Sequence, residues 1–328
     1  MGEIQITTLL LNIVFLIIGF VFLIKGADVF VDGATSIAKV LKVPALVIGL
    51  TIVALGTSLP ELAVSVIAAI EGAGDMSVGN VIGSNIFNIS VVLGATSLLF
   101  PIAIQKEILS FELPVLLGIS ILLLILGLAF KEVGLIAGII FLLLLVGYVF
   151  FLIYRSKKQR ETLEEEQEEE QETISPIKSI IFLVLGAAAI WFGGECVNTT
   201  SVVIAKFFGM EENLIALTIV ALGTSLPELV TSLVAAKKGE NDVALGNVIG
   251  SNTLNILFIL GVAGVINPVL ISEPMIFDMI VMIGITFMLF IMAFVTHKKK
   301  GLNLPCGITL IITYASYLAY IIFRNYAG

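Results

Sequence analysis

Long apolar stretches follow one another along almost the whole chain, and only short polar segments separate them. A helix that crosses a lipid bilayer needs about 20 mostly apolar residues. The pattern therefore predicts an all-α polytopic membrane protein with ten transmembrane helices. The predicted spans cover approximately residues 7–38, 43–70, 77–100, 109–129, 132–154, 177–206, 213–236, 243–266, 274–296 and 303–324.

The composition agrees with a chain that is surrounded by lipid. Of the 328 residues, 59% are hydrophobic and 13% are charged, whereas a soluble domain has about 45–50% apolar and about 25% charged residues. The net charge of −8 has a local origin, because residues 161–172 hold eight glutamates and leave 17 acidic against 17 basic residues elsewhere. The sequence has no basic stripe of the kind that binds nucleic acid, so we expect no nucleic-acid partner.

Few residues are suited to a redox or transition-metal cofactor. Cys196 and Cys306 are the two cysteines and are too few for a disulfide framework. His297 is the single histidine, and we therefore expect no bound cofactor. The first eight residues contain neither a basic segment nor a small-residue cleavage site, so no cleavable signal peptide is predicted.

The loops between the predicted spans differ in their content of lysine and arginine. Alternate loops on one side hold thirteen such residues, and those on the other side hold three. Cytoplasmic loops of membrane proteins collect lysine and arginine. We therefore expect both termini to be external and the 155–176 loop to be cytoplasmic, in a cell membrane.

The two halves of the chain repeat each other at an offset of 167 residues. Residues 50–62 and 217–229 share the thirteen letters LTIVALGTSLPEL, and residues 79–85 and 246–252 share GNVIGSN. Each copy holds five predicted spans, an odd number, so the second copy enters the membrane from the opposite side. Inverted repeats of this kind are typical of secondary transporters, whose substrate site lies near the midplane.

The repeat predicts the organisation of the chain. The first five-helix repeat is expected at residues 1–154, with its motif at 50–94. An acidic cytoplasmic linker follows at 155–176. The second, inverted five-helix repeat is expected at 177–328, with its motif at 217–261.

Each repeated motif carries one glutamate, Glu61 or Glu228, near the middle of a predicted span. A charged group at that depth costs about 2.5–3.5 kcal/mol on insertion scales, and it normally faces a cavity and a partner. No lysine or arginine lies at a depth that would pair it with both glutamates, so a bound cation is the expected countercharge. The alternative is a pair of protonated glutamates that hydrogen-bond across the bundle.

A proline precedes each glutamate. Pro60 and Pro227 each remove a helix hydrogen bond and crowd the carbonyl group four residues earlier. The breaks should therefore free the carbonyl groups of Gly56 and Gly223. Non-helical backbone at membrane depth is tolerated only where it is buried in protein or lines a wet cavity. A kink that serves packing alone is the alternative, but two identical breaks beside two identical glutamates favour a binding site.

Oxygen-bearing side chains surround the glutamates in both motifs. These hard ligands suit calcium, sodium or magnesium, and magnesium fits least well because it keeps its water and demands octahedral geometry. Asn85 and Asn252 are also repeated, but they lie about 100° round the helix from the neighbouring serines and are expected to cap or bridge helices. The candidate ligands are Thr57, Ser58, Ser84 and Asn88 in the first repeat and Thr224, Ser225, Ser251 and Asn255 in the second.

The paired GTSLPE and GNVIGSN segments resemble the α-repeats of the sodium/calcium exchangers, in the calcium/cation antiporter superfamily. The resemblance extends over the whole chain and implies a secondary active antiporter, not an enzyme, which exchanges sodium for calcium by alternating access. It implies calcium ligands at Thr57, Glu61, Thr224 and Glu228. The implied sodium ligands are Ala54, Thr57, Ser58, Glu61, Ser84, Asn88, Ala221, Thr224, Ser225, Glu228, Ser251 and Asn255, with Ala54 and Ala221 acting through their carbonyl groups.

The chain departs from some relatives at Asn255, where the potassium-dependent branch and certain archaeal exchangers carry an aspartate. Asparagine in both repeats leaves two formal negative charges, so we expect no dependence on potassium. The calcium-sensing domains of animal exchangers have no counterpart here, which indicates the prokaryotic type. The first and sixth spans carry few matched ligands and are candidates for a sliding gate, with Gly26 and Gly193 as bending or packing points.

Three other functions compete with this interpretation. A calcium/proton antiporter is the nearest, because glutamates also carry protons, although the shell of hydroxyl groups favours sodium. An ion channel predicts a continuous pore and oligomeric symmetry, whereas an inverted repeat favours a carrier, for which a monomer is sufficient. The segment 72–75 has the GxGD spelling of intramembrane aspartyl proteases, but it falls in an external loop and lacks a second membrane aspartate.

Overall fold

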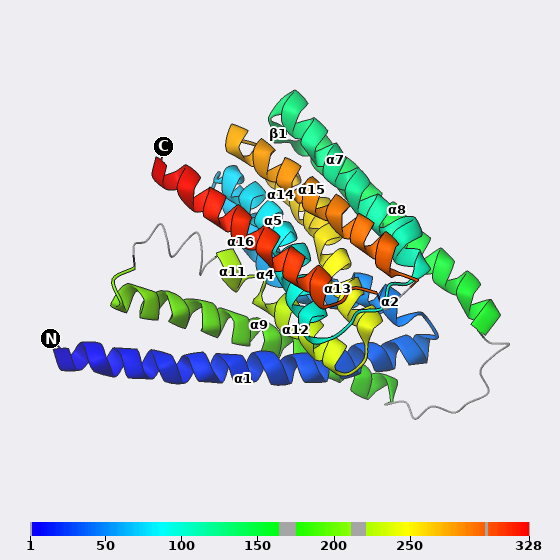
Figure 1. Ribbon diagram of the computed structural model, residues 1–328, viewed down its shortest axis with the longest axis horizontal. Helices are drawn as coiled ribbons and strands as arrows, with labels where there is room; N and C mark the ends of the chain where they lie inside the picture. Colours follow the sequence, from blue (N-terminus) through cyan, green and yellow to red (C-terminus); the bar gives the residue numbers. More distant parts are fainter. Residues whose placement is uncertain (1, 164–174, 211–220, 299–300, 328) are drawn as a thin grey trace.

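A computed structural model describes residues 2–163, 175–210, 221–298 and 301–327. Within these ranges the protein is a bundle of long helices (Figure 1). Eight of the described helices are long and apolar enough to cross a bilayer, and one bent pair of helices makes a ninth candidate span. The prediction of an all-helical, multi-pass membrane protein is confirmed.

The described helices follow the predicted spans in order. The seventh predicted span, 213–236, begins among residues 211–220, which lie outside the described residues. In the first half the helices are α1 (Gly2–Leu41), α2 (Ala45–Ile48), η1 (Gly49–Val53), α3 (Ala54–Thr57), α4 (Leu59–Ile70), α5 (Gly74–Phe87), η2 (Asn88–Val92), α6 (Leu93–Leu99), η3 (Ile108–Glu112), α7 (Leu113–Phe130) and α8 (Leu135–Leu163). In the second half they are α9 (Pro176–Phe207), α11 (Ala221–Gly223), α12 (Leu226–Lys237), α13 (Asn241–Leu254), η5 (Asn255–Ile259), α14 (Leu260–Ile266), α15 (Glu273–Thr296) and α16 (Leu304–Ala327).

The second span is broken where the sequence predicts it. The segments Ala45–Thr57 and Leu59–Ile70 meet at an angle of 52°. Ser58 lies between them with φ −86° and ψ 10°, and Pro60 occupies the first turn of α4. Because proline has no N–H, it cannot continue the hydrogen-bond ladder from α3 into α4. Ser225 has nearly the same conformation before α12, with φ −91° and ψ 6°.

The third and eighth spans form the buried centre of the bundle. Each contains a π-helical turn, which begins at Asn88 in η2 and at Asn255 in η5. Such single turns occur often at functional sites because they rotate the helix and disturb its hydrogen-bond ladder. The two spans meet at Asn85 and Asn252, and each amide Nδ2 donates to the backbone carbonyl of the other residue at 3.2 Å. The prediction that these asparagines bridge helices is confirmed.

Helices α1 and α9 lie side by side along one edge of the bundle (Figure 1). Glycines allow their backbones to approach. A Cβ atom on Gly26 would lie 2.9 Å from the Ile190 backbone nitrogen, and one on Gly193 would lie 2.6 Å from the Leu23 nitrogen. Gly26 and Gly193 are therefore packing points between the two helices.

Short backbone contacts tie the two halves together at their loops. β1 (Glu132–Val133) pairs antiparallel with β2 (Val269–Leu270). A single bridge also joins Ile102 to Leu302. Each contact joins the loop after the third span of one half to the loop between the last two spans of the other half.

Candidate cation-binding site

The two repeated glutamates lie at equivalent places in the fold. Glu61 is in the first turn of α4 and Glu228 in the first turn of α12. Both side chains are completely buried. The amino end of a helix carries a partial positive charge, which stabilises a carboxylate there. The breaks before α4 and α12 therefore place each carboxylate beside a helix end in the interior of the bundle.

Each glutamate is held by a serine from the other half of the chain. Ser58 donates a hydrogen bond to Glu228 Oε1 at 3.0 Å, and Ser225 donates to Glu61 Oε1 at 3.2 Å. The second carboxylate oxygen of each glutamate is buried and has no hydrogen-bond partner among the described residues. The two carboxylates share one site and each keeps one oxygen unused.

No basic side chain of the described residues compensates these carboxylates. The ion pairs that these residues form involve neither Glu61 nor Glu228. The two glutamates are instead brought to one site by the serine hydrogen bonds between the halves. Two ionised carboxylates in such surroundings carry a large desolvation cost unless they gain a partner. A cation between them supplies that partner.

One side of the site is closely bonded. Thr57 Oγ1 donates to Asn247 Oδ1 at 3.0 Å and lies 3.4 Å from Ser251 Oγ. Ser251 in turn lies 3.5 Å from Glu228 Oε1 and 3.5 Å from the Ala54 carbonyl oxygen. The Ala54 carbonyl also keeps its helix hydrogen bond from the Ser58 N–H, at 3.0 Å. These polar groups join α3, α12 and α13.

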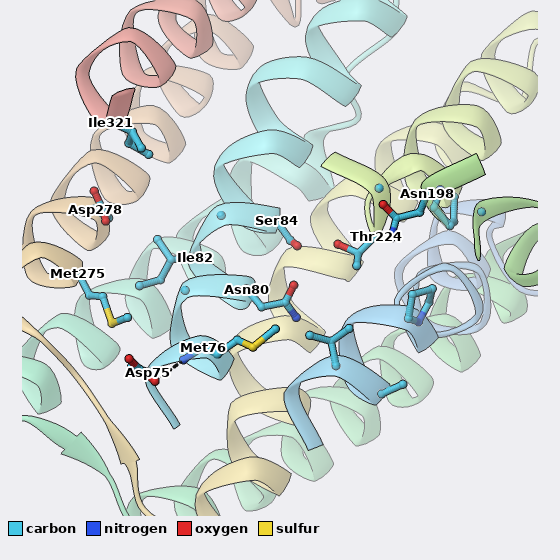
Figure 2. Close-up of a pocket in the computed structure, with 18 of the residues that line it drawn as sticks. Asp75, Met76, Asn80, Ile82, Ser84, Asn198, Thr224, Met275, Asp278 and Ile321 are labelled. Atoms are coloured by element: carbon cyan, nitrogen blue, oxygen red, sulfur yellow. Dashed lines mark hydrogen bonds between the residues drawn. The ribbon is translucent and has the colours of Figure 1, made fainter. Parts of the chain in front are cut away.

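The equivalent groups on the other side are not bonded to one another. Thr224 Oγ1 and Ser84 Oγ are buried and have no hydrogen-bond partner among the described residues. Both residues line a cavity of about 700 Å³, where their oxygens point toward one another (Figure 2). The cavity extends from the candidate site to the carboxyl ends of α4 and α16, at Ile67 and Arg324, and to the amino end of α5, at Asp75. One side of the site is thus sealed and the other has an open approach.

The remaining predicted ligands lie in the same buried centre. Asn88 and Asn255 are completely buried at the start of the two π-helical turns. Asn88 Oδ1 and Asn255 Oδ1 have no hydrogen-bond partner among the described residues. The Asn255 amide nitrogen donates to Asn85 Oδ1 at 3.0 Å. Ala221 is the first residue of α11. In the part of the chain that the structure describes, no group of three or more histidine, cysteine or acidic residues is placed to hold a metal ion.

Two asparagines that were not predicted as functional hold the glutamate segments in place. Asn80 Nδ2 donates to the Glu61 carbonyl at 3.1 Å and to Ser65 Oγ at 3.0 Å. Asn247 makes the equivalent contacts to the Glu228 carbonyl and to Ser232, at 3.4 and 3.0 Å. Their identity in both GNVIGSN copies was the available signal. Their role was not evident because they bond to the helix backbone rather than to the carboxylates.

Comparison with known sequences gives one family. Residues 11–154 and 178–323 each match the model of the sodium/calcium exchanger protein family. The chain is 40% identical over 296 residues to the putative antiporter CaxA of Alkalimonas amylolytica, covering 89% of this chain and 92% of that protein. It is 34% identical over 321 residues to the sodium/calcium exchanger MaX1 of Methanosarcina acetivorans, covering 87% and 91%. It is also 35% identical over 245 residues to the inner membrane protein YrbG of Escherichia coli, covering 72% and 74%.

Comparison with solved structures gives the same fold. The sodium-calcium exchanger NCX_Mj, soaked with 2.5 mM Na⁺ and 10 mM Sr²⁺, superposes with a TM-score of 0.81 and 30% sequence identity. The match covers 95% of this chain and 99% of NCX_Mj. The architecture described above, with its two broken spans, is therefore that of a known cation exchanger.

Proposed function

The chain belongs to the sodium/calcium exchanger protein family, and from that premise we propose that it exchanges sodium for calcium across the membrane by alternating access. The observation that carries the proposal is the pair Glu61 and Glu228. The two carboxylates are buried together without a basic partner among the described residues, and each is bonded by a serine of the other half. A site of this kind needs cations before it can be closed off from water.

The proposed organisation is two inverted repeats, residues 1–154 and 177–328, joined by the acidic cytoplasmic linker 155–176. The reciprocal bonds between Asn85 and Asn252 support this division, because they relate equivalent atoms of the two halves. The exchange of serines between the two glutamates supports it in the same way. We assign the transport site to the interface of the two repeats, as in other inverted-repeat carriers.

The proposed ligands follow from the oxygens that surround the carboxylates. Calcium takes six to eight oxygens, including carboxylates, carbonyls and water, and its proposed protein ligands are Glu61, Glu228, Thr57 and Thr224. The flanking groups supply neutral oxygens for sodium, which needs less compensating charge. The proposed sodium ligands are Glu61, Glu228, Thr57, Thr224, the carbonyls of Ala54 and Ala221, and Ser58, Ser84, Asn88, Ser225, Ser251 and Asn255.

Coupling follows from competition for the same two carboxylates. One calcium ion neutralises both, and sodium ions neutralise them in turn. An empty site has two unpaired charges, and closing it away from water is expensive. The loaded carrier therefore changes conformation readily while the empty carrier does not, which prevents uncoupled leak. We assign the movement to α1 and α9, which pack closely on each other.

The proposed orientation places both termini outside the cell. In that orientation the cavity of about 700 Å³ opens to the exterior, because it reaches Arg324 near the carboxyl end of α16. The opposite end of the bundle has a cavity of only about 20 Å³, lined by Pro44 and Arg155 among others. This arrangement supports a conformation that receives ions from outside.

A calcium/proton antiporter is the alternative function. The hydroxyl and amide oxygens around the carboxylates favour sodium, because a proton needs no shell of further ligands. The test is equilibrium binding of calcium to the purified protein, first at fixed pH while sodium replaces choline, and then without sodium while the pH is lowered. We expect sodium to displace calcium competitively. Displacement by protons alone, with no effect of sodium, would support the alternative.

A further inference from the structure

Asn198 brings a further oxygen to the candidate site from a helix without any predicted ligand. It lies on α9 and lines the same cavity as Ser84 and Thr224. Figure 2 shows the three side chains next to one another, with the Asn198 oxygen beside Thr224. Asn198 Oδ1, Thr224 Oγ1 and Ser84 Oγ are all buried without a hydrogen-bond partner among the described residues.

A repeated glycine allows this approach. The Asn198 amide rests against the backbone of α11 at Gly223, where a Cβ atom would lie only 2.4 Å from Oδ1. Any side chain at position 223 would push the amide away from the helix break. The asparagine is therefore held at the point where α11 ends and the segment leading to Glu228 begins.

The first repeat has no such group. The residue 167 positions before Asn198 is Val31, which is apolar and completely buried. Gly56, the equivalent of Gly223, is covered by the Phe30 ring, whose Cζ would lie 2.7 Å from a Cβ atom. Helix α1 therefore places an aromatic ring against Gly56, whereas α9 places an amide against Gly223. The difference separates the sealed side from the side that the cavity reaches.

A buried amide oxygen without a partner is unfavourable, because it has lost its water and gained nothing in exchange. Amide carbonyl oxygens are ordinary ligands of calcium and of other hard cations. We propose that Asn198 Oδ1 is an additional ligand for the cation that enters from the cavity, together with Thr224 and Ser84. This inference rests on the proposed transport function and deepens it.

The position of Asn198 gives the ligand a second effect. Asn198 is attached to α9, which packs on α1, while Thr224 lies in the turn between α11 and α12 and Ser84 belongs to α5. A cation that binds all three oxygens favours the position of α9 in which they converge, since a ligand shifts a conformational equilibrium by its difference in affinity. Asn198 therefore links ion binding to the helix that borders the entrance.

The test compares three variants in proteoliposomes of known orientation. Asn198→Val copies the residue of the first repeat, and Asn198→Asp keeps an oxygen and adds charge. Thr199→Val is the control, because Thr199 is the next residue along the chain and its side chain is exposed. We measure the sodium and calcium concentrations that half-saturate exchange at each membrane face, and equilibrium calcium binding in detergent. Asn198→Val should raise the half-saturating concentrations about five- to tenfold at the cavity face only. Asn198→Asp should bind calcium more tightly relative to sodium than the unmodified protein does, and Thr199→Val should change neither face.

The outcomes separate this inference from the proposed function. An unmodified protein that binds calcium but does not exchange it for sodium would refute the proposed function, and the comparison of calcium binding would still test Asn198. Unchanged affinity in Asn198→Val, or an equal loss at both faces, would overturn the role of Asn198 as a ligand. If Asn198→Val does not fold, Asn198→Asp decides, because a purely structural amide predicts no gain for calcium relative to sodium.

Discussion

The Ser58 hydroxyl donates a hydrogen bond to the Glu228 carboxylate over 3.0 Å, although 170 residues separate them in the chain. Ser225 and Glu61 repeat the contact in the opposite sense at 3.2 Å. Each glutamate thus accepts its shortest serine hydrogen bond from the other half of the protein. The two carboxylates therefore depend on one interface, and anything that moves the halves relative to each other changes both at once.

Replacing either glutamate with glutamine should stop exchange. Glu61→Gln and Glu228→Gln each keep the shape of the side chain but remove half of the negative charge that compensates a divalent cation. Breaking a buried charge interaction costs about 3–5 kcal/mol, so calcium exchange should fall by about a hundredfold or more. The measurement is calcium uptake by proteoliposomes with equal amounts of inserted protein. Glu71→Gln, at an exposed residue after α4, is the control and should leave uptake unchanged.

Asn247 should contribute more to stability than Asn80. Asn247→Ala removes contacts to Glu228, Ser232 and Thr57, whereas Asn80→Ala removes only the two equivalent contacts to Glu61 and Ser65. Each buried polar group left without a partner costs about 1–3 kcal/mol. Thermal unfolding of the purified variants in detergent should therefore show the larger loss for Asn247→Ala. A larger loss for Asn80→Ala would contradict the difference between the sealed and open sides.

Gly250 should not tolerate a side chain. A Cβ atom there would lie 2.6 Å from the Leu50 carbonyl oxygen and 2.8 Å from Ala54 Cβ. Overpacking of this kind costs about 1–3 kcal/mol and would separate α13 from the segment that holds Thr57. Gly250→Ala should lower both the unfolding temperature and exchange. Gly284→Ala is the control, because Gly284 is exposed on α15 and no described atom would contact its Cβ, and it should be neutral or slightly stabilising.

Lys238 fastens α1 to the end of α12. Its ammonium group lies 2.8 Å from the Asp28 carboxylate and 2.7 Å from that of Asp32. The equivalent of Lys238 in the first repeat is Glu71, which cannot form the matching ion pair with an acidic residue of α9 at the other end. Lys238→Gln should weaken the conformation with the open cavity. The measurement uses a protein in which Cys196 and Cys306 are replaced and Met76→Cys places one thiol in the cavity. Adding Lys238→Gln to this protein should lower the reactivity of that thiol toward a membrane-impermeant reagent. Lys237→Gln is the adjacent control, and equal reactivity in both variants would count against this role.

The attachment should persist across the physiological pH range. Partial burial lowers the pKa of Lys238, but its hydrogen bonds to Asp28 and Asp32 outweigh burial, so the pKa lies above its ordinary value. A lysine with a raised pKa in the folded state stabilises it fully below the unfolded pKa of about 10.4. The contribution is lost only as the pH rises through the higher folded value. The difference in cavity labelling between Lys238→Gln and the unmodified protein should therefore be the same at about pH 6 and about pH 9. A difference that disappears at pH 9 would show that the ion pair is lost within this range.

The sequence was sufficient for the spans, the repeat and the two glutamates, because each depends on a local pattern. The length of an apolar stretch identifies a span. Pro60 and Pro227 interrupt their helices whatever the neighbouring helices are. The membrane position of Glu61 and Glu228 follows from the same pattern. The ion ligands and the boundaries of the two repeats remain proposals, supported by the contacts around these residues.

The difference between the two sides of the site was beyond the sequence. Residues 50–62 and 217–229 are identical, yet Thr57 is bonded to Asn247 whereas Thr224 Oγ1 has no partner among the described residues. Identical segments have identical local preferences, so the distinction arises from which conformation the whole bundle occupies. Asn198 is not predicted as a ligand by the repeat, because its counterpart in the first half is the apolar Val31.

Calcium uptake into proteoliposomes distinguishes exchange driven by sodium from exchange driven by protons. One preparation of proteoliposomes is used for both arms. Uptake is followed first under an outward sodium gradient at equal pH and then under a proton gradient without sodium. We expect rapid uptake under the sodium gradient, its loss in Glu61→Gln and Glu228→Gln, and little uptake under the proton gradient. Uptake that follows the proton gradient and does not depend on sodium would refute sodium/calcium exchange by this protein.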